Sequence, residues 1–369
     1  MYEAVFELET VTPLFMRGAD QGKAEFRSAS VKGVLRWWFR ALAHAVLLGN
    51  VDENEAISMI KDRESELFGS TGRKSKVLVR VSFREEKKVD VRELGARYLS
   101  FGLSGKGLVG TAKVELLSHE RRYLEIAREV SEVAFAFGGL GARTTRGMGS
   151  IQLLGEYVTS SYLQNVYKSA LDVIGGYLGY GLNRTPNVEL PEFPALHPKF
   201  FRVKLGSMLY TTPYGRFSVL SDIDRKFHKF RHSGPKHERF VKGKLISYWV
   251  TEQYDDVKRA YRGSSDVELP YSAFGLPHQY NFFSLGVKGL MIEGEVHERR
   301  ASPIRFKVVR GSDGKHRPMV VYLKHRFLPE GENLKVRIKR DIRARGIPQP
   351  GYRDVERFFN EFPGREVEL

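Results

Sequence analysis

The order of hydrophobic and polar positions divides residues 1–158 into strands and helices. Apolar and polar side chains alternate over residues 2–10, which is typical of a strand, and hydrophobic positions then recur at helical spacing over residues 31–46. Ser30 is the expected N-cap of this helix because serine caps helices well, and Gly49 is expected to end it. The further elements predicted in this part are a helix over 52–68, strands over 77–83, 98–103 and 111–117, a helix over 119–137 and a strand over 150–158.

Residues 159–369 show a similar pattern with less regularity. Four prolines between residues 186 and 198 mark an irregular connection, after which strand-like and helical segments alternate. The order strand, helix, strand, strand, helix, strand in residues 1–158 is that of the ferredoxin-like plan, which RNA-recognition modules share. We therefore predict an α+β protein with a ferredoxin-like domain at 1–158 and a second domain at 159–369, which begins with a connecting helix. The elements expected in the second domain are a helix over 161–178, a strand over 200–210, a helix over 237–261 and strands over 288–295, 303–309, 319–323 and 334–339.

Composition places the chain among folded, strongly basic proteins. Its 369 residues carry 60 Lys and Arg against 44 Asp and Glu, a formal charge of +16, which attracts polyanions and above all nucleic acid. A hydrophobic fraction of 41% excludes a disordered basic tail. The absence of cysteine excludes disulfides, thiol nucleophiles and cysteine-based metal sites. The sequence has neither a secretory signal pattern nor an apolar run of membrane-spanning length, so we expect a cytoplasmic protein that does not engage a membrane.

A glycine- and arginine-rich segment, residues 138–149, stands between a predicted helix and a predicted strand. Five of its twelve residues are glycines, whose backbone can turn sharply and hold an anion, and its two arginines match phosphate geometry. The spacing fits neither a dinucleotide-binding loop nor a Walker loop, so no nucleotide cofactor is predicted. A helix cap before a tight strand entry would explain one glycine, whereas five glycines with two arginines favour a ligand-facing loop. Its candidate RNA-binding residues are Gly139, Gly141, Arg143, Thr144 and Arg146.

The start of the first predicted helix is a second candidate phosphate site. Lys32 stands in the first turn, where the helix dipole disfavours a cation unless an anion joins it. Gly33 costs helix stability, by up to about 1 kcal/mol relative to alanine. Both residues suit a helix that meets a phosphate, although an ordinary solvated face is the alternative, above all for Arg40. The candidate residues here are Arg27, Ser30, Lys32, Arg36 and Arg40.

A third basic stretch, residues 225–244, mixes cations with aromatic side chains. It holds eight Lys or Arg against one acidic residue, with three phenylalanines between them. Charges that follow a phosphate backbone beside rings that stack on bases suit single-stranded nucleic acid, and Lys229 and Arg231 are the candidate ligands. The sequence is turn-rich at 233–235, so part of the stretch is expected to be a mobile loop that becomes ordered when RNA binds. The alternative is a solvated charged loop. A basic run at 335–340 alternates like a strand and is expected to present its charges on one face.

Patterns for catalysis and metal binding are weak. His228, His232 and His237 have helical spacing, but neither an H-E-x-x-H motif nor a nucleophile elbow accompanies them. Asp222 and Asp224 suit a turn or a helix cap better than a cation site. We therefore predict no catalytic residue and no metal site.

Several of these segments together resemble the RAMP superfamily of CRISPR RNA-binding proteins. The resemblance rests on ETVTPLF at 9–15, SVKGVLRWWFR at 30–40, ELFG at 66–69 and the glycine-arginine segment. It is most specific toward the first subunits of Cmr-type (type III-B) RNA-silencing complexes, and FGLP at 274–277 and RRASP at 299–303 continue it.

This resemblance implies two fused ferredoxin-like domains around a basic cleft. It also implies a non-catalytic subunit near one end of a ribonucleoprotein, whose partners are single-stranded guide or target RNA, or both, and other subunits of the effector complex. Two alternatives stay open. A RAMP endoribonuclease that processes CRISPR repeat RNA would need a general base, for which His44, His119 and His228 are candidates, and an assembly subunit would bind protein partners through its basic face.

Overall fold

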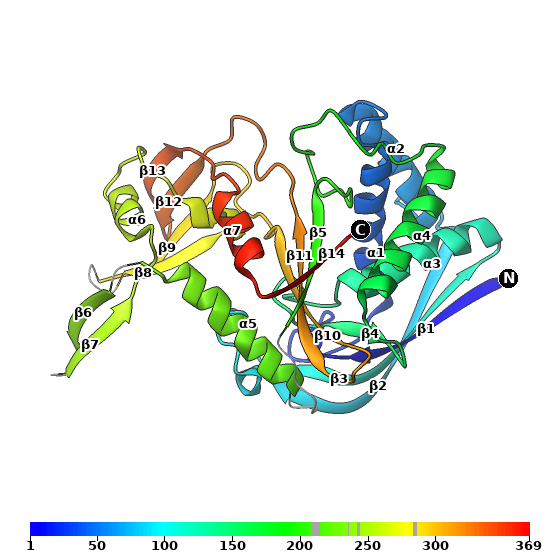
Figure 1. The fold of residues 1–369 in the computed structure, drawn as a ribbon, viewed down its shortest axis with the longest axis horizontal. Coiled ribbons are helices and arrows are strands. Elements are labelled where there is room, and N and C mark those ends of the chain that lie inside the picture. Colours follow the sequence, from blue (N-terminus) through cyan, green and yellow to red (C-terminus); the bar gives the residue numbers. More distant parts are fainter. Residues whose placement is uncertain (208–214, 235, 242–243, 283–285) are drawn as a thin grey trace. The chain divides into compact units, whose positions relative to one another are not determined.

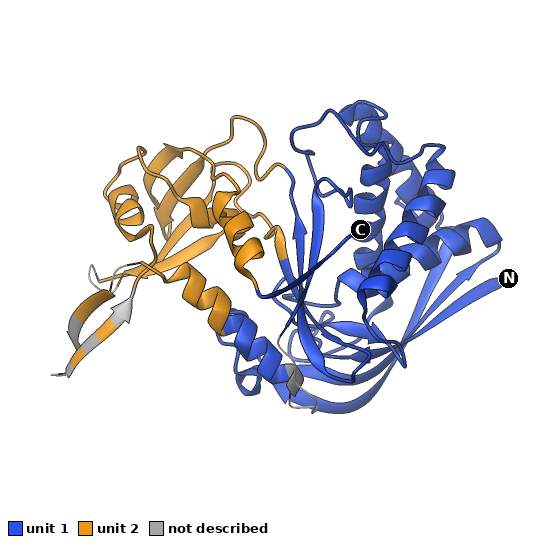
Figure 2. Ribbon diagram, in the orientation of Figure 1, with its two compact units in different colours: residues 1–224, 305–325, 363–369 blue, residues 225–304, 326–362 orange. Residues whose placement is uncertain are grey.

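The computed structural model is an α+β protein with three four-stranded antiparallel sheets and one two-stranded hairpin (Figure 1). The chain divides into two compact units (Figure 2). The first unit comprises residues 1–224, 305–325 and 363–369, and the second comprises residues 225–304 and 326–362. The boundary at residue 158 that the sequence indicates therefore lies inside the first unit. The structure describes residues 1–207, 215–234, 236–241, 244–282 and 286–369.

The first sheet has the strand order β2-β3-β1-β4, and buried and exposed positions alternate in β1 and in the first half of β2. In β1, Phe6 and Leu8 are buried while Val5 and Glu7 are exposed, as the period of two in the sequence predicts. The helices pack on the buried face. The elements are β1 (Tyr2–Thr10), β2 (Val77–Asp90), β3 (Lys106–Ser118), β4 (Ile151–Leu153), α1 (Ser28–Leu47), α2 (Glu53–Phe68), η1 (Val91–Leu94), α3 (Arg121–Phe137) and α4 (Ser160–Leu178).

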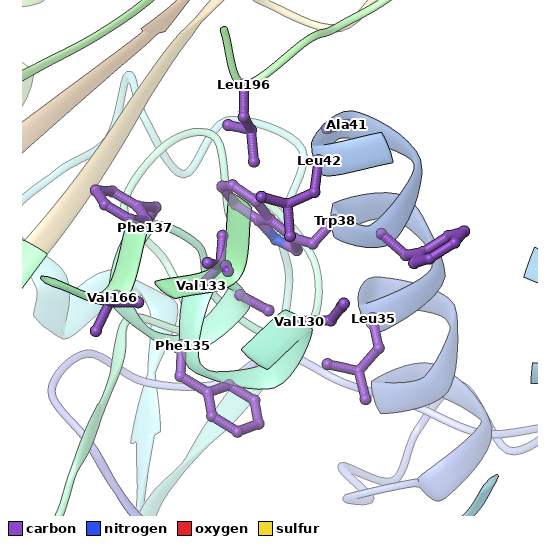
Figure 3. Packing of buried hydrophobic residues seen from close by; sticks show 14 of the residues in the cluster. Leu35, Trp38, Ala41, Leu42, Val130, Val133, Phe135, Phe137, Val166 and Leu196 are labelled. Carbon is purple, nitrogen blue, oxygen red and sulfur yellow. The ribbon is translucent and has the colours of Figure 1, made fainter. Parts of the chain in front are cut away.

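The core of the first unit lies between this sheet and its helices (Figure 3). Leu35, Trp38 and Leu42 recur at helical spacing along α1 and are almost completely buried, as are Val130 and Val133 of α3. Each such side chain contributes roughly 1.5–3 kcal/mol through burial, which outweighs the helix-weakening effect of Gly33. The hydrophobic period of the sequence thus sets the orientation of both helices.

A second sheet in the first unit has the order β10-β11-β5-β14. Its strands follow the same scheme as the first sheet, because in each the first strand lies between the third and the last. One helix follows the first strand and another precedes the last one. These elements are β5 (Phe201–Gly206), α5 (Gly215–Arg231), β10 (Ile304–Arg310), β11 (His316–Leu323), α7 (Arg353–Glu361) and β14 (Gly364–Val367).

The second unit is built around the sheet β13-β12-β9-β8. Phe227 and Phe230 of α5 pack with Phe274 and Phe358 in its core. Residues 225–231 of the basic stretch are therefore the end of a helix. The turn-rich part expected to be mobile begins at Ser233, and residue 235 in it lies outside the described residues. The remaining elements are β6 (Lys236–Val241), β7 (Lys244–Trp249), α6 (Tyr254–Tyr261), η2 (Pro270–Phe274), β8 (His278–Phe282), β9 (Val287–Gly294), β12 (Leu334–Ile338) and β13 (Asp341–Ile347).

Helix α1 begins at Ser28, three residues before the start that a Ser30 cap would give. Arg27 occupies the N-cap, so the prediction that Ser30 caps the helix is wrong, and Ser30 lies in the first turn. The Arg27 amide donates to Met16 Sδ (3.3 Å), which keeps this residue extended, while its carbonyl accepts the first helical bond from Val31 N (3.1 Å). A long-range contact therefore decides where the helix starts.

Several predicted elements differ from the structure. Residues 98–103 form turns rather than a strand, because Gly95 and Gly102 have φ values of +63° and +81° that reverse the chain. The strand predicted over 150–158 ends at Leu153, and that over 200–210 ends at Gly206, with 208–210 outside the described residues.

The largest difference is residues 237–261, predicted as one helix. They form the paired strands β6 and β7 followed by α6, and residues 242–243 lie outside the described residues. Isoleucine, tyrosine and tryptophan over 246–249 favour a strand, and pairing with β6 supplies the hydrogen bonds that a helix would have made locally. Within the described residues, we find no helix with the length and hydropathy needed to cross a bilayer.

Candidate nucleic-acid interface

The glycine-arginine loop, residues 138–149, joins α3 to β4 and is folded tightly on itself. Gly149 has φ +61°, and a Cβ there would lie 1.8 Å from the Leu140 carbonyl oxygen. The Leu140 amide donates to Gly149 O (2.9 Å) across the same contact. Gly141, at φ +88°, similarly approaches Phe15 O, which a Cβ would meet at 2.7 Å. These glycines are required by the loop's own packing.

The backbone amides of the loop are largely used inside the protein. Ala142 N donates to Phe15 O (2.7 Å) and Gly149 N to Pro13 O (2.9 Å), which ties the loop to the segment after β1. Arg146 N donates to Arg143 O (2.8 Å). Because these amides already have acceptors, they are not available to an anion, and we consider next the side chain at the tip of the loop.

Arg143 is the side chain that this tip presents. It has φ +59°, a left-handed conformation that costs a non-glycine residue on the order of 1 kcal/mol and that the surrounding hydrogen bonds maintain. The residue is exposed, and its Nη2 would lie 2.9 Å from a Cβ on Gly102. Desolvation lowers the pKa of Arg143, yet a guanidinium remains protonated at neutral pH. The loop therefore holds a cation at the surface.

A second arginine reaches the same region. Arg17 Nη2 donates to the Ser104 carbonyl, and Gly105, at φ +74°, gives it room. Phe101, at the start of this turn, is 59% exposed. Sequence reasoning did not select Arg17 or Phe101. The available signal was the glycines at 102, 105 and 107, which lie in and just after the strand that we predicted over 98–103.

Arg27 contacts the segment 15–18, which also carries Arg17. Its amide bonds to Met16 Sδ, its Cδ would lie 3.5 Å from a Cβ on Gly18, and it forms a loose ion pair with Glu25 (3.6 Å). We call Arg17, Arg27, Phe101 and Arg143 the loop surface, because all four belong to segments that meet at residues 15–18 or 102–105.

Two other candidate arginines have an internal partner. Arg36 Nε lies 2.5 Å from Glu64 Oε1, and Arg40 Nη1 lies 3.1 Å from Glu64 Oε2. The Glu64 side chain is only 6% exposed, so it requires these cations for its charge to be tolerated. Lys32 Nζ contacts Ser75 Oγ (3.2 Å), and burial followed by the nearby Arg36 charge lowers its pKa. The partners of this cluster come from α2 and the segment after it.

Thr144 and Arg146 are half-buried, on the side of the loop that meets the second sheet. The Thr145 carbonyl accepts from Phe306 N (3.1 Å), and Thr12 Oγ1 donates to Gly147 O (2.7 Å). The loop thus connects the two sheets of the first unit, and Arg146 is held beside β10 rather than at the exposed tip.

The side chains of two of the three phenylalanines in the basic stretch 225–244 are described, and of these Phe227 is buried and Phe230 half-buried. Arg231 is 7% exposed and lies over the rings of Phe227 and Phe274, with Nη2 2.9 Å from His278 Nδ1. Lys229 is exposed. Because one face of α5 is buried, Arg231 lies inside the second unit, whereas Lys229 lies at the surface.

The basic run at 335–340 is likewise paired internally. Arg337 Nε and Lys335 Nζ lie 2.5 Å and 3.5 Å from Glu293 Oε1, and Glu293 is 1% exposed. A cross-strand carboxylate in β9 therefore neutralises charges that the sequence suggested would face a ligand.

Two of the three histidines considered for catalysis, His44 and His228, stack on other rings, and His119 is exposed. His44 is fully buried, and its ring stacks on Phe193 with centroids 3.9 Å apart. His228 stacks on His232 at 4.1 Å, and burial lowers the pKa of His232 to about 4. Within the described parts of the chain, no three His, Cys, Asp or Glu side chains gather as metal ligands would.

Three comparisons bear on these observations. A protein-family model described as the RAMP superfamily matches residues 7–152. The chain is 35% identical to the CRISPR system Cmr subunit Cmr1-2 of Pyrococcus furiosus over 185 residues, which are 42% of this chain and 96% of that protein. It is 27% identical to Cmr1-1 of the same organism over 289 residues, 70% of this chain and 81% of that protein. The crystal structure of apo Cmr1 from Pyrococcus furiosus matches with a TM-score of 0.61 at 21% identity, over 100% of this chain and 99% of that chain, so the two share a fold.

Proposed function

Because this chain belongs to the RAMP superfamily and is homologous to the Cmr1 subunits of the type III-B Cmr complex, we propose that it is a non-catalytic RNA-binding subunit of such a complex. Its ligand would be single-stranded guide RNA, target RNA or both, and its neighbours other subunits near one end of the assembly. We propose that the chain takes part in antiviral RNA silencing and that other subunits of the complex cleave the RNA.

The strand orders support a finer description of the fold. We propose that the two sheets of the first unit are two fused ferredoxin-like domains, with the second unit inserted in the second domain. Each sheet places its first strand between the third and the last, which is the arrangement expected of a β-α-β-β-α-β chain. The basic cleft between the two domains, in which RNA would lie, is part of this proposal.

The observation that carries the proposal is the loop surface. Arg143, at the left-handed tip of the loop, and Arg17, which contacts the adjoining glycine turn, offer two forked guanidinium donors for phosphates. The chain as a whole has a charge of +16. Arg27 and Arg143 are thus the sequence-predicted ligands that the geometry favours, with Arg17 added. Lys229, exposed on the second unit, stays a separate candidate for a phosphate contact.

The decisive experiment measures binding of single-stranded RNA by the full chain over a salt series. Arg143→Ala is expected to weaken binding and to reduce the slope of log K against log salt by about 0.7 for the phosphate contact that it loses. Arg121→Ala is the matched control, because it removes an exposed arginine at the opposite end of α3. The control should bind as the wild-type chain does.

The same assay separates the alternatives. Cleaved RNA after incubation with the chain would establish the endoribonuclease. Failure of the wild-type chain to bind RNA at low salt would contradict the proposal and assign the basic face to protein partners.

A further inference from the structure

Phe101 is an aromatic side chain that the fold holds out in solvent. The residues just before it are buried, Leu99 to 1% and Ser100 to 7% exposure, and Leu99 N donates to Asp224 Oδ1 (2.6 Å). The Phe101 amide itself donates to Tyr98 O (3.4 Å) within the turn. The backbone is thus fixed on the N-terminal side of Phe101, while the ring remains 59% exposed and gains little from burial.

The turn that follows Phe101 carries two guanidinium groups. Arg143 lies against Gly102, and Arg17 donates to the Ser104 carbonyl beside Gly105. At both glycines a Cβ would lie 2.9 Å from an arginine Nη2, so the absence of side chains is what lets the cations approach this backbone. The ring belongs to this turn, and the two guanidinium groups reach the turn from other segments of the first unit.

We propose that Phe101 is a stacking platform for one unpaired nucleobase of the RNA strand whose phosphates Arg17 and Arg143 hold. This inference rests on the proposed function and adds to it the class of ligand: a strand with exposed base faces. An aromatic ring beside a cationic path for the backbone is the combination by which proteins bind single strands. A duplex keeps its bases stacked and hides their faces, so the loop surface prefers single-stranded RNA.

The test compares Phe101→Ala, Phe101→Trp and Arg143→Ala in the full chain. With a single-stranded RNA of mixed sequence, Phe101→Ala is expected to weaken binding about 10-fold to 100-fold, the range for loss of one base–aromatic stack, without changing the salt slope. Phe101→Trp should retain the affinity, whereas Arg143→Ala should reduce the slope. Tyr2→Ala, which removes another exposed ring in the first unit, is the control and should bind normally.

An abasic RNA of the same length provides the second measurement. Wild-type chain and Phe101→Ala should bind it equally, because it retains the phosphates and lacks the base. If Phe101→Ala instead binds mixed-sequence RNA as well as the wild-type chain does, while Arg143→Ala still loses affinity, the stacking site is refuted and the proposed function stands. If the wild-type chain binds no RNA, the proposed function itself fails.

Discussion

At the scale of single residues, a buried carboxylate decides what two candidate phosphate ligands do. Glu64 accepts from both Arg36 and Arg40, and Arg36 Nη1 also donates to Gly69 O (3.0 Å). The guanidinium groups are 33% and 44% exposed, so each is half inside a cluster that joins α1 to α2. Their positive charges compensate the buried charge of Glu64, so we assign both arginines a role in the stability of the fold.

Arg36→Ala tests this assignment. It leaves Glu64 buried with Arg40 as its remaining cation, and we expect the free energy of unfolding to fall by about 1–2 kcal/mol in urea denaturation. RNA affinity of the folded chain should be unchanged. Arg121→Ala, which breaks an exposed pair with Glu125, should cost less than about 0.5 kcal/mol. If Arg36→Ala had normal stability but had lost RNA affinity, this assignment would be wrong and Arg36 would be a phosphate ligand.

At the scale of elements, the glycine-arginine loop joins α3 to β4, and many of its backbone amides have hydrogen-bond acceptors inside the protein. Its amides bond to the segment after β1, and its glycines fit where a Cβ would overlap a carbonyl. Its order matters for function because the loop tip positions Arg143.

Gly149→Ala is expected to destabilise the protein strongly. The new Cβ would meet Leu140 O at 1.8 Å in a left-handed conformation, so we expect a loss of at least about 3 kcal/mol of unfolding free energy. Gly155→Ala is the matched control, because Gly155 also has positive φ (+82°) but faces open space. It should cost only about 1 kcal/mol, the conformational penalty alone. Equal thermal unfolding of the two variants would contradict the steric argument.

At the scale of the whole molecule, several of the cations that make the chain basic lie inside the protein. Arg231 lies in the core of the second unit, Arg337 pairs with Glu293, and Lys307 of β10 is 2% exposed in the first unit. Lys307 Nζ donates to the Phe135 carbonyl at the end of α3, where it joins the second sheet to the helices of the first. Burial lowers its pKa from 10.5 to about 7.

The buried lysine predicts a specific pH dependence of stability. Because the pKa is lower in the folded state, the unfolded chain binds the proton more tightly between about pH 10 and 7, and stability falls as the pH falls through this window. Below about pH 7 the penalty is constant. Lys307→Met removes it, so we expect its advantage over the wild-type chain to be larger at pH 7 than at pH 10, by on the order of 2 kcal/mol in urea denaturation. Lys61→Met, at an exposed site on α2, should show no such trend.

The local sequence by itself determined the elements whose signal is short-range. Hydrophobic period and the Asp52 cap place α1 and α2 in nearly their observed positions, since both act within one or two turns. The glycine motif marked residues 138–149 as a loop, and the resemblance led to the RAMP superfamily. Only the tertiary structure decided which cations remain at the surface. Glu64, Glu293 and Phe135 meet their basic partners through contacts far apart in the chain, and the energy of burying a charge depends on those partners rather than on neighbours in sequence.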